Sequence, residues 1–480
     1  MNGTTYTLAL EGAMKVSIDK IQERLASYAC ELNFDGLNPQ TVHAAKVRVI
    51  DTLGALIAGF DGEPCKVLRS VAAQNPHPRG ATVIGTQLRT TLEMAAFANA
   101  TTACYAELSD TYYATGSFGG HPSDVLTPLL AAAEGVRASG KEFITSVVLA
   151  YEIYLRLNHV FHNMGFDHTN FSCLATAVAA GKLLNLSREQ LLHCISIAAV
   201  PNNALRQSRV GFLSMWKAAA SGYAGRAGVF SAVLAQAGME GPHLPFEGAA
   251  GWCNHIALER FSLDIMGGKN VPFKILDTSI KLRPCSGLTL AAVTAAEKIV
   301  PLRDPHQVKR IVVEVNKKAK ELVGTHAHHW EPNSRESADH SAPYLVAATL
   351  IDGIITPRSF DDAHISNAKL RALMQKIEVI ENPEFTIAYD QTPSKHLARV
   401  TVTAGDDTYV TGSSGGGEDD LSAAKSNVEI EGKFRTLTED RFGTERVSML
   451  LKTLWDLTDL RDIAVIPSAL EIDALAAGET

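Results

Sequence analysis

The stretch SMWKAAASGYAGRAGVFSAVLAQAGMEGP, residues 214–242, decides the fold class of this chain. Most of its positions carry alanine, glycine or serine, with larger apolar residues at helical spacing. Small residues let neighbouring helices approach closely, so the pattern predicts a helix buried on several sides. The same texture recurs, and predicts further helices, at residues 42–60, 126–140, 141–161, 173–187 and 188–201.

The texture changes after about residue 275. Residues 308–323 begin as a β-branched strand, residues 376–385 resemble a second strand, and residues 398–413 alternate around a turn as a hairpin does. Residues 341–355 and 367–379 follow a helical pattern, and the tail at 429–463 returns to helix. We therefore predict a mainly α protein with a large all-helical domain (residues 1–275 with 430–480) and a smaller α+β domain (residues 276–429).

Composition narrows the classes of partner. The net charge of -8 disfavours a nucleic acid, because phosphate binding needs a basic surface. No run of apolar residues is long enough for a membrane span. Seven widely spaced cysteines without a CxxC motif indicate reduced thiols. No secretory signal is evident, and Glu11 and Asp19 disfavour a transit peptide, so we expect the cytoplasm, or the mitochondrion if the source is eukaryotic.

One segment interrupts the helices with polar side chains. ELSDTYYATGSFGGHPSDVL, residues 107–126, brings acids, hydroxyls, glycines and an imidazole between two alanine-rich flanks. One interpretation is a capped helix and a polar loop, with Ser123 or Asp124 capping the next helix. The other, which we favour, is one wall of an active site.

Cations gather before and within the small-residue helix. Arg206, Arg209 and Lys217 lie within twelve residues, which suits a polycarboxylate ligand. Apolar surroundings would lower the pKa of Lys217. A solvated cationic face or a snorkelling lysine is the alternative. Lys281 and Arg283 fall at the junction of the two regions, where small-ligand sites are common.

The histidines do not predict a metal site. His168 precedes a helix of small residues, and THAHHWEPNSRESADHSAPY (325–344) is histidine-rich. The close HAHH spacing differs from that of tetrahedral ligands, and neither CxxC nor HExxH accompanies it. The chain also lacks a GxGxxG fingerprint and a GxxxxGK[ST] loop, so no nucleotide cofactor is expected.

Several segments together resemble a known family. They are DTYYATGSFGGHPSDVLTPLLAAAE, GFDHTNFSCLATAVAAGKLLNLS, RQSRVGFLSMWKAAASGYAGRAGVFSAVLA, SIKLRPC and WEPNSRESADHSAPYLVAATLIDG, in this order. The sequence resembles the MmgE/PrpD family, which includes 2-methylcitrate dehydratases and cis-aconitate decarboxylases. The resemblance implies a helical domain completed by the C-terminal tail, a smaller α+β lid domain, a homodimer, an active site between the domains, and no metal or organic cofactor.

The resemblance also implies which residues form the site. Catalytic positions of the family fall on Glu107, where relatives carry Asp, and on Thr111, His121, His168, Lys217 and Lys281. One position departs from the pattern. Relatives commonly have a histidine a few residues after the junction lysine, whereas residues 282–293 contain none, and Ser286 or Leu290 stands in its place.

The expected activity is that of a cofactor-independent lyase on a small di- or tricarboxylic acid. Cations stabilise charge that develops beside a carboxylate, and a positioned acid–base group moves the proton. We expect His121 and His168 to transfer protons and Glu107 and Thr111 to orient His121 or the substrate. The expected substrate-binding residues, besides Lys217 and Lys281, are Arg206, Arg209, Arg283, Asp110 and His340.

We favour a 2-methylcitrate dehydratase-like reaction. A cis-aconitate decarboxylase-like reaction is the alternative, followed by an isomerase or epimerase of a related diacid. A carboxylate-binding protein that has lost its chemistry is the non-enzymatic alternative, and the missing histidine motivates it.

Overall fold

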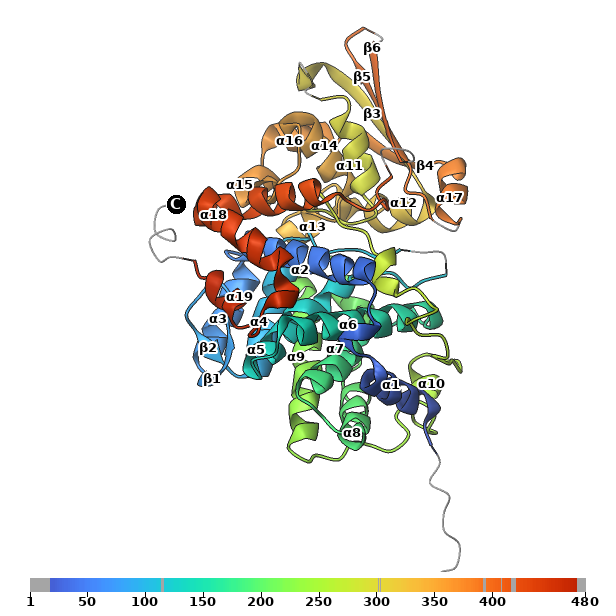
Figure 1. Ribbon diagram of the computed structural model, residues 1–480. Coiled ribbons are helices and arrows are strands. Elements are labelled where there is room, and N and C mark those ends of the chain that lie inside the picture. The colour runs from blue at the N-terminus through green and yellow to red at the C-terminus, as the bar shows by residue number, and fades with distance from the viewer. Residues whose placement is uncertain are drawn as a thin grey trace, which may run out of the picture.

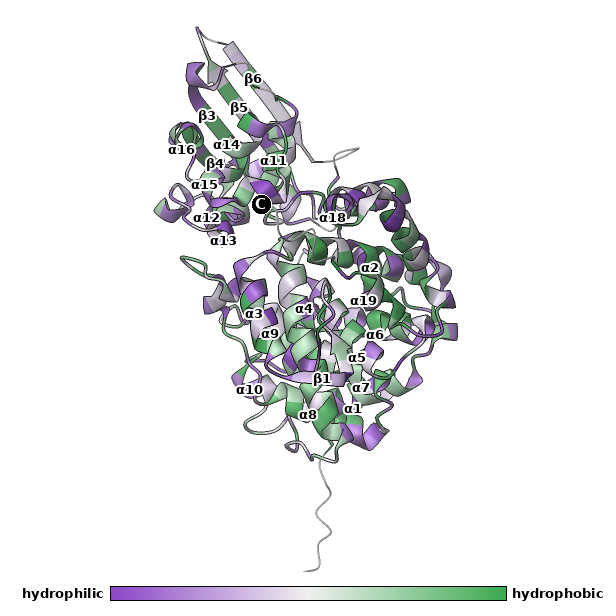
Figure 2. Ribbon diagram, turned by 90° about the vertical axis from the view of Figure 1, so that its left-hand side faces the viewer, coloured by the Kyte–Doolittle hydropathy of each residue, from purple (hydrophilic) through white to green (hydrophobic). Residues whose placement is uncertain are grey.

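The computed structural model describes residues 18–113, 116–300, 302, 304–391, 394–406, 408–415 and 420–472. Glu11 and the outermost parts of the predicted helical domain, residues 1–17 and 473–480, lie outside these ranges. The described chain is mostly helical with a small sheet, so the predicted mainly α class is confirmed. Figure 1 shows a helical part below and a smaller part with the sheet above, and Figure 2 shows the same two parts from the side.

The helical part contains most of the chain. Its helices are α1 Lys20–Glu31, α2 Pro39–Gly59, α3 Glu63–Ala73, α4 Leu92–Tyr105, α5 Leu126–Gly135, α6 Gly140–Val160, α7 Thr169–Leu183, α8 Arg188–Ala199, α9 Trp216–Gln236, α10 Trp252–His255, α18 Asn427–Trp455 and α19 Val465–Ala469. Capping boxes start α6 at Ser139 and α8 at Ser187, where side chain and backbone satisfy each other's free groups.

Small residues of α9 allow neighbouring helices to approach closely, as their pattern in the sequence predicts. Helix α9 packs against α4 and α7. A Cβ atom added at Gly228 of α9 would lie 2.7 Å from the carbonyl oxygen of Cys173 in α7. Only glycine allows the two backbones to come so close, so one face of α9 lies directly against α7.

The prediction that this part is all-helical is wrong in one place. Strands β1 (Pro76–Thr82) and β2 (Arg89–Thr90) form a short antiparallel pair. The buried carboxylate of Glu134 accepts hydrogen bonds from the amide and hydroxyl of Thr82 and from Arg89. This fixes the pair on α5 through contacts that are distant in sequence, which local patterns do not reveal.

The smaller part carries a four-stranded sheet of order β4-β3-β5-β6. Its elements are α11 Leu290–Glu297, β3 Val308–Val315, α12 Lys317–Val323, α13 Arg335–Ala338, α14 Ala342–Asp352, α15 Asp362–Ile365, α16 Ala368–Met374, β4 Ile377–Glu381, α17 Pro383–Tyr389, β5 Ala398–Ala404 and β6 Thr408–Ser414.

The predicted hairpin is confirmed, with Val400 opposite Gly412 in the β5–β6 pair. Strand β3 runs antiparallel to β5 and parallel to β4. Alternate residues of β3 and β5 are buried in one cluster with α11, α14 and α16. The predicted strand at 376–385 is too long at its end, because Asn382 and Pro383 begin helix α17.

Two large hydrophobic clusters contain most of the buried apolar side chains among the described residues. One extends from Ile21 to Ile280 and continues through Ile430 to Ile472, and the other extends from Cys285 to Val402. Helix α18, broken at Gly443 where φ is 73°, packs on α2 and places its apolar residues in the first cluster. These clusters support the division into residues 1–275 with 430–480 and residues 276–429, which we retain as a proposal.

Candidate active site

The polar segment 107–126 begins just after α4 ends at Tyr105. Thr111 and Ser279 exchange two backbone hydrogen bonds of 2.8 Å, which tie the segment to the domain junction. The carboxylate of Asp110 accepts hydrogen bonds from the amide of Ser123 at 2.9 Å and the hydroxyl of Tyr151 at 3.1 Å. Asp110 therefore positions the segment, and both of its oxygens are engaged within the protein.

Gly120 brings this segment against α6 and α7. Its φ is 139°, and an added Cβ atom would meet the Tyr154 hydroxyl at 2.3 Å and the ring of His168 at 2.8 Å. No larger residue fits there without displacing them. As a result, the rings of His121 and His168 lie edge to face with centroids 5.5 Å apart.

Two buried lysines share one buried carboxylate. Glu107 accepts from Lys217 Nζ at 2.6 Å and from Lys281 Nζ at 2.7 Å, and all three residues are at most 5% exposed. Lys281 also donates to the carbonyl oxygens of Glu107 and Cys285. Burial raises the pKa of Glu107, but the two ammonium groups outweigh it and hold this pKa well below its usual range.

The pKa expected for Lys217 from its apolar helix is wrong in direction. Burial does lower it, but the carboxylates of Asp339 and Glu107 raise the pKa of Lys217 above its usual value. Asp339 Oδ1 lies 3.5 Å from Lys217 Nζ. Both acids arrive from outside the helix, so the helix sequence alone could not indicate them. Lys217 is a fixed ammonium group and not a neutral amine.

The hydrogen bonds of His121 define its tautomer. Its Nδ1 lies 2.8 Å from the carbonyl oxygen of Asp110, which can only accept, so Nδ1 carries the proton. Nε2 is then an unprotonated acceptor, 3.9 Å from Glu107 Oε1. Burial, and then the Lys281 ammonium, lower the pKa of His121 well below its usual range. The imidazole is therefore a neutral base near pH 7.

His168 has the opposite arrangement. The Tyr154 hydroxyl accepts from the amide of His121 at 3.0 Å, so its own proton is directed to His168 Nδ1 at 3.1 Å. Nδ1 thus accepts and Nε2 carries the proton. Burial and then the Arg209 guanidinium lower the pKa of His168 to about 3.

Arg209 binds the carboxylate of Asp167, the residue that precedes His168. Its Nε donates to Asp167 Oδ2 at 2.6 Å, while its buried Nη2 has no hydrogen-bond partner among the described residues. Arg206 lies nearby on the same turn, half-buried over the ring of Phe118. A buried donor without a partner is unusual in proteins, and a carboxylate ligand would satisfy it.

The histidine-rich segment contributes an acid and an imidazole. His340 Nδ1 lies 2.5 Å from Asp339 Oδ1, and its side chain is 29% exposed. Potential ligand atoms of Glu107, Asp339 and His340 lie within 4.8 Å of one another, close enough to bind one metal ion together. However, Lys217 Nζ already bonds to both carboxylates, and an ammonium and a divalent cation compete for the same oxygens.

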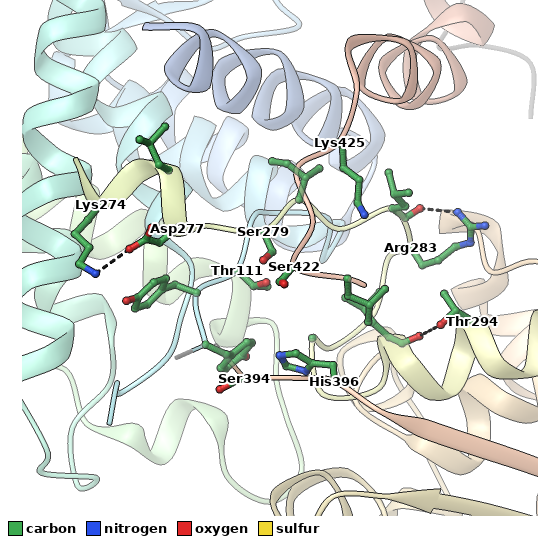
Figure 3. Close-up of a pocket in the computed structure, with 18 of the residues that line it drawn as sticks. Thr111, Lys274, Asp277, Ser279, Arg283, Thr294, Ser394, His396, Ser422 and Lys425 are labelled. Atoms are coloured by element: carbon green, nitrogen blue, oxygen red, sulfur yellow. Dashed lines mark hydrogen bonds and ion pairs between the residues drawn. The ribbon is translucent and has the colours of Figure 1, made fainter. Parts of the chain in front are cut away.

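Two predicted site residues lie elsewhere. Thr111 and Arg283 line a cavity of about 460 Å3, as does Ser279, and Lys217, His121 and His168 are not among its lining residues. Figure 3 shows this cavity. Arg283 forms a two-pronged ion pair with Glu297, which occupies its guanidinium group. The chemistry that a lyase needs is in the buried cluster, so we take the cluster and not the cavity as the candidate active site.

Four functional contacts were missed from the sequence. Tyr154, Asp124, Asp167 and Asp339 all hold a predicted residue in place or surround it. Burial, opposed by Arg209, raises the pKa of Asp124 to about 6. Its carboxylate accepts from Ser172 and Ser221, and it caps no helix. The only sequence signal for Asp124 and Asp167 was their closeness in the chain to His121 and His168.

Comparison with known proteins now identifies the relatives. The MmgE/PrpD N-terminal domain matches residues 23–263, and the MmgE/PrpD C-terminal domain matches residues 284–457. The chain belongs to the MmgE/PrpD family. The 2-methylcitrate dehydratase of Escherichia coli K12 is 26% identical over 76% of this chain and 79% of its own length. Human cis-aconitate decarboxylase is 26% identical over 95% of both chains, and the mitochondrial 2-methylcitrate dehydratase of Yarrowia lipolytica is 25% identical over 82% and 78%.

The family confirms the resemblance inferred from the sequence segments. Its dehydratase and decarboxylase relatives identify the chain as a lyase at family level. Within the described residues, no helix is both long enough and apolar enough to cross a membrane.

Proposed function

We propose that the buried cluster is the active site of a lyase for a small di- or tricarboxylic acid, with a 2-methylcitrate dehydratase-like reaction. The observation that supports this most is the opposite tautomers of two adjacent histidines. His121 presents an unprotonated Nε2 and His168 a protonated one, with ring centroids 5.5 Å apart. A dehydration needs one base and one acid on neighbouring atoms of the substrate.

In the proposed reaction, His121 Nε2 removes the proton on the carbon beside a carboxylate. The electron pair of that C–H bond forms the C=C bond, and the C–O bond to the adjacent hydroxyl breaks. His168 Nε2–H protonates the departing hydroxyl, which leaves as water. His121 is then an imidazolium and His168 an imidazolate near the Arg209 guanidinium, and one proton passed from His121 to His168 through solvent restores two neutral rings.

Fixed cations would stabilise the intermediate charge. Lys217 and Lys281 are anchored by Glu107, so they need no reorientation when negative charge develops. Arg209 would use its unpaired Nη2, and Arg206 and His340 would complete the binding of the carboxylates. Asp110 acts in this scheme through His121, as a positioning residue, and Thr111 through its backbone pair with Ser279. No metal or organic cofactor takes part in it.

We also propose a homodimer. Trp216, Tyr223 and Phe230 recur every seven residues on α9, which places them on one face. They are 49%, 44% and 43% exposed, large values for such side chains. A second copy of the chain, as the family resemblance implies, would cover this face. We place the enzyme in the cytoplasm, with the mitochondrion as the alternative because one relative is mitochondrial by name.

Decarboxylation of cis-aconitate is the second candidate. Similarity to the human decarboxylase extends over 95% of both chains. In that reaction no C–H proton is abstracted. The C–C bond to a carboxylate breaks, carbon dioxide leaves, and an imidazole protonates the resulting carbanion. An isomerase or epimerase would use His121 alone to abstract a proton from a related diacid.

Proton NMR of the purified enzyme with 2-methylcitrate, citrate or cis-aconitate in separate tubes tests the proposal. A new alkene signal from a hydroxy acid supports the dehydratase, and conversion of cis-aconitate to itaconate replaces it by the decarboxylase. Exchange of one substrate proton in D2O without net conversion would indicate an isomerase or epimerase. Tight tricarboxylate binding without any turnover would indicate a binding protein and refute the lyase.

A further inference from the structure

The cavity at the junction of the two hydrophobic clusters belongs to no step proposed above. It measures about 460 Å3, within the range of small-molecule sites. Its walls come from both parts of the chain: Thr111, Ser279 and Leu276 on one side, and Thr294 and His396 on the other. Figure 3 shows Thr111, Ser279, Thr294 and His396 around this cavity.

The cavity has a charge unlike that of the whole chain. The chain carries a net charge of -8, yet the lining contains the cations Lys274, Arg283 and Lys425 and a single carboxylate, Asp277. Asp277 pairs with Lys274 at 2.8 Å, and Glu297 pairs with Arg283. The lining itself therefore carries an excess of positive charge, which favours an anionic ligand.

Lys425 is the cation that remains available. It makes no hydrogen bond or ion pair with the part of the chain that the structure describes, although Asp420 and Glu429 lie near enough to sense its charge. In Figure 3 its ammonium group reaches into the cavity from the segment that leads to α18. It can therefore bind a carboxylate without breaking an existing pair.

The rest of the lining is largely apolar. The apolar and aromatic lining side chains are those of Tyr112, Tyr113, Leu276, Ile280, Leu282, Leu290 and Leu421. Burial lowers the pKa of His396 to about 4, so this ring is neutral and offers hydrogen bonds without charge. An apolar surface with one free ammonium group matches a molecule with an apolar body and one acidic group. A small tricarboxylate would leave the apolar surface unfilled.

We propose that this cavity is a second binding site, distinct from the buried cluster, for an organic carboxylate with an apolar body. The anion pairs with Lys425, and the apolar body lies along the leucines and tyrosines between the two parts of the chain. The cavity and the buried cluster share two segments of backbone. Thr111 follows Asp110, whose carbonyl holds His121, and Ser279 lies two residues before Lys281.

Isothermal titration calorimetry with decanoate tests this site. Acetate, which has the carboxylate but almost no apolar body, and decan-1-ol, which has the apolar body but no charge, are the comparison ligands. Decanoate should bind more tightly than either. Lys425→Gln should weaken decanoate about tenfold or more, the worth of a charge-assisted hydrogen bond. Lys452→Gln, which alters an exposed lysine of α18, is the matched control and should bind as the unaltered chain does.

A second pair of variants fills the space. Ser422→Trp changes an exposed residue at the rim and Leu421→Trp a half-buried one, and each should weaken decanoate binding while the thermal unfolding curve is retained. Absence of saturable binding, or binding that Lys425→Gln or both tryptophan variants leave unchanged, overturns the proposal. Displacement of decanoate by citrate would mean one shared site and also overturns it. Because binding is measured without turnover, the result is independent of the proposed lyase reaction.

Discussion

Replacement of Glu107 by Gln removes the charge that two buried ammonium groups share. At 2.6 Å and an effective dielectric constant of about 20, one such contact is worth about 6 kcal/mol before the cost of burial is subtracted. Removal of one partner from a buried pair typically lowers the free energy of unfolding by about 3–5 kcal/mol, since the other charge is left unpaired. We expect a loss in this range, because Asp339 remains near Lys217 but nothing else carries negative charge to Lys281 within bonding distance among the described residues.

The direction of the pH dependence follows from the pKa shifts. The pKa of Glu107 is depressed on folding, so its contribution is present above about 4.5 and is lost as the pH falls through the lower folded value. The pKa of Lys217 is raised, so its contribution is present below about 10.5 and is lost at higher pH. The deficit of Glu107→Gln should therefore be complete and constant between about pH 5 and pH 10, and should shrink in stronger acid.

Urea unfolding followed by circular dichroism at pH 7 measures this deficit. Glu107→Asp is the matched variant, since it keeps the charge and shortens the side chain by one methylene group. It should lose less than half as much free energy as Glu107→Gln. A Glu107→Gln protein within 1 kcal/mol of the unaltered chain, or a Glu107→Asp protein equally destabilised, would refute the shared-carboxylate account.

Three further outcomes are expected. His121→Gln and His168→Gln should each lower kcat by about a hundredfold or more while the chain stays folded, as judged by circular dichroism. Because the pKa of both histidines is lowered, kcat/KM should stay constant from pH 8 to pH 6 and fall only in stronger acid, as His121 gains a proton; a midpoint near 6.5 would contradict the neutral, buried imidazole. Phe230→Asp should convert the dimer to a monomer in light scattering, whereas Val428→Asp, at an 80% exposed position of α18, should not; a Phe230→Asp dimer would remove α9 from the interface.

Periodicity predicted several of the long helices, among them α2, α6, α7, α8 and α9, but not the hairpin β1–β2 or helix α17. The small-residue pattern of 214–242 reports how close a neighbouring helix comes, and Gly228 of α9 meets α7 in that way. The β1–β2 pair depends on Glu134, which lies more than forty residues further along the chain. A local pattern contains no information about such a partner.

The sequence predicted which residues contribute to the candidate site, but it predicted their neighbours and charge states only in part. His168, Lys217 and Lys281 are buried, and the mostly buried His121 lies beside Glu107 and His168 in the same cluster. Arg283 and Thr111 do not, although each is within a few residues of a member of the cluster, because chain neighbours can face different cavities. The charge state of Lys217 required knowledge of Glu107 and Asp339, which are 110 and 122 residues away in the chain.

Glu107 shows why the site resists a local prediction. Its φ of 53° lies in the left-handed region, where asparagine and aspartate are far more common than glutamate. The strain costs on the order of 1–3 kcal/mol and persists only where the surroundings fix it. Here they do so twice, because Lys281 Nζ binds both the carbonyl and the carboxylate of Glu107, and Lys217 binds the second oxygen. The two ammonium groups that would stabilise the negative charge of the substrate therefore also stabilise the strained backbone of Glu107. Local propensity fails at this residue because the interactions that fix its conformation belong to the proposed chemistry.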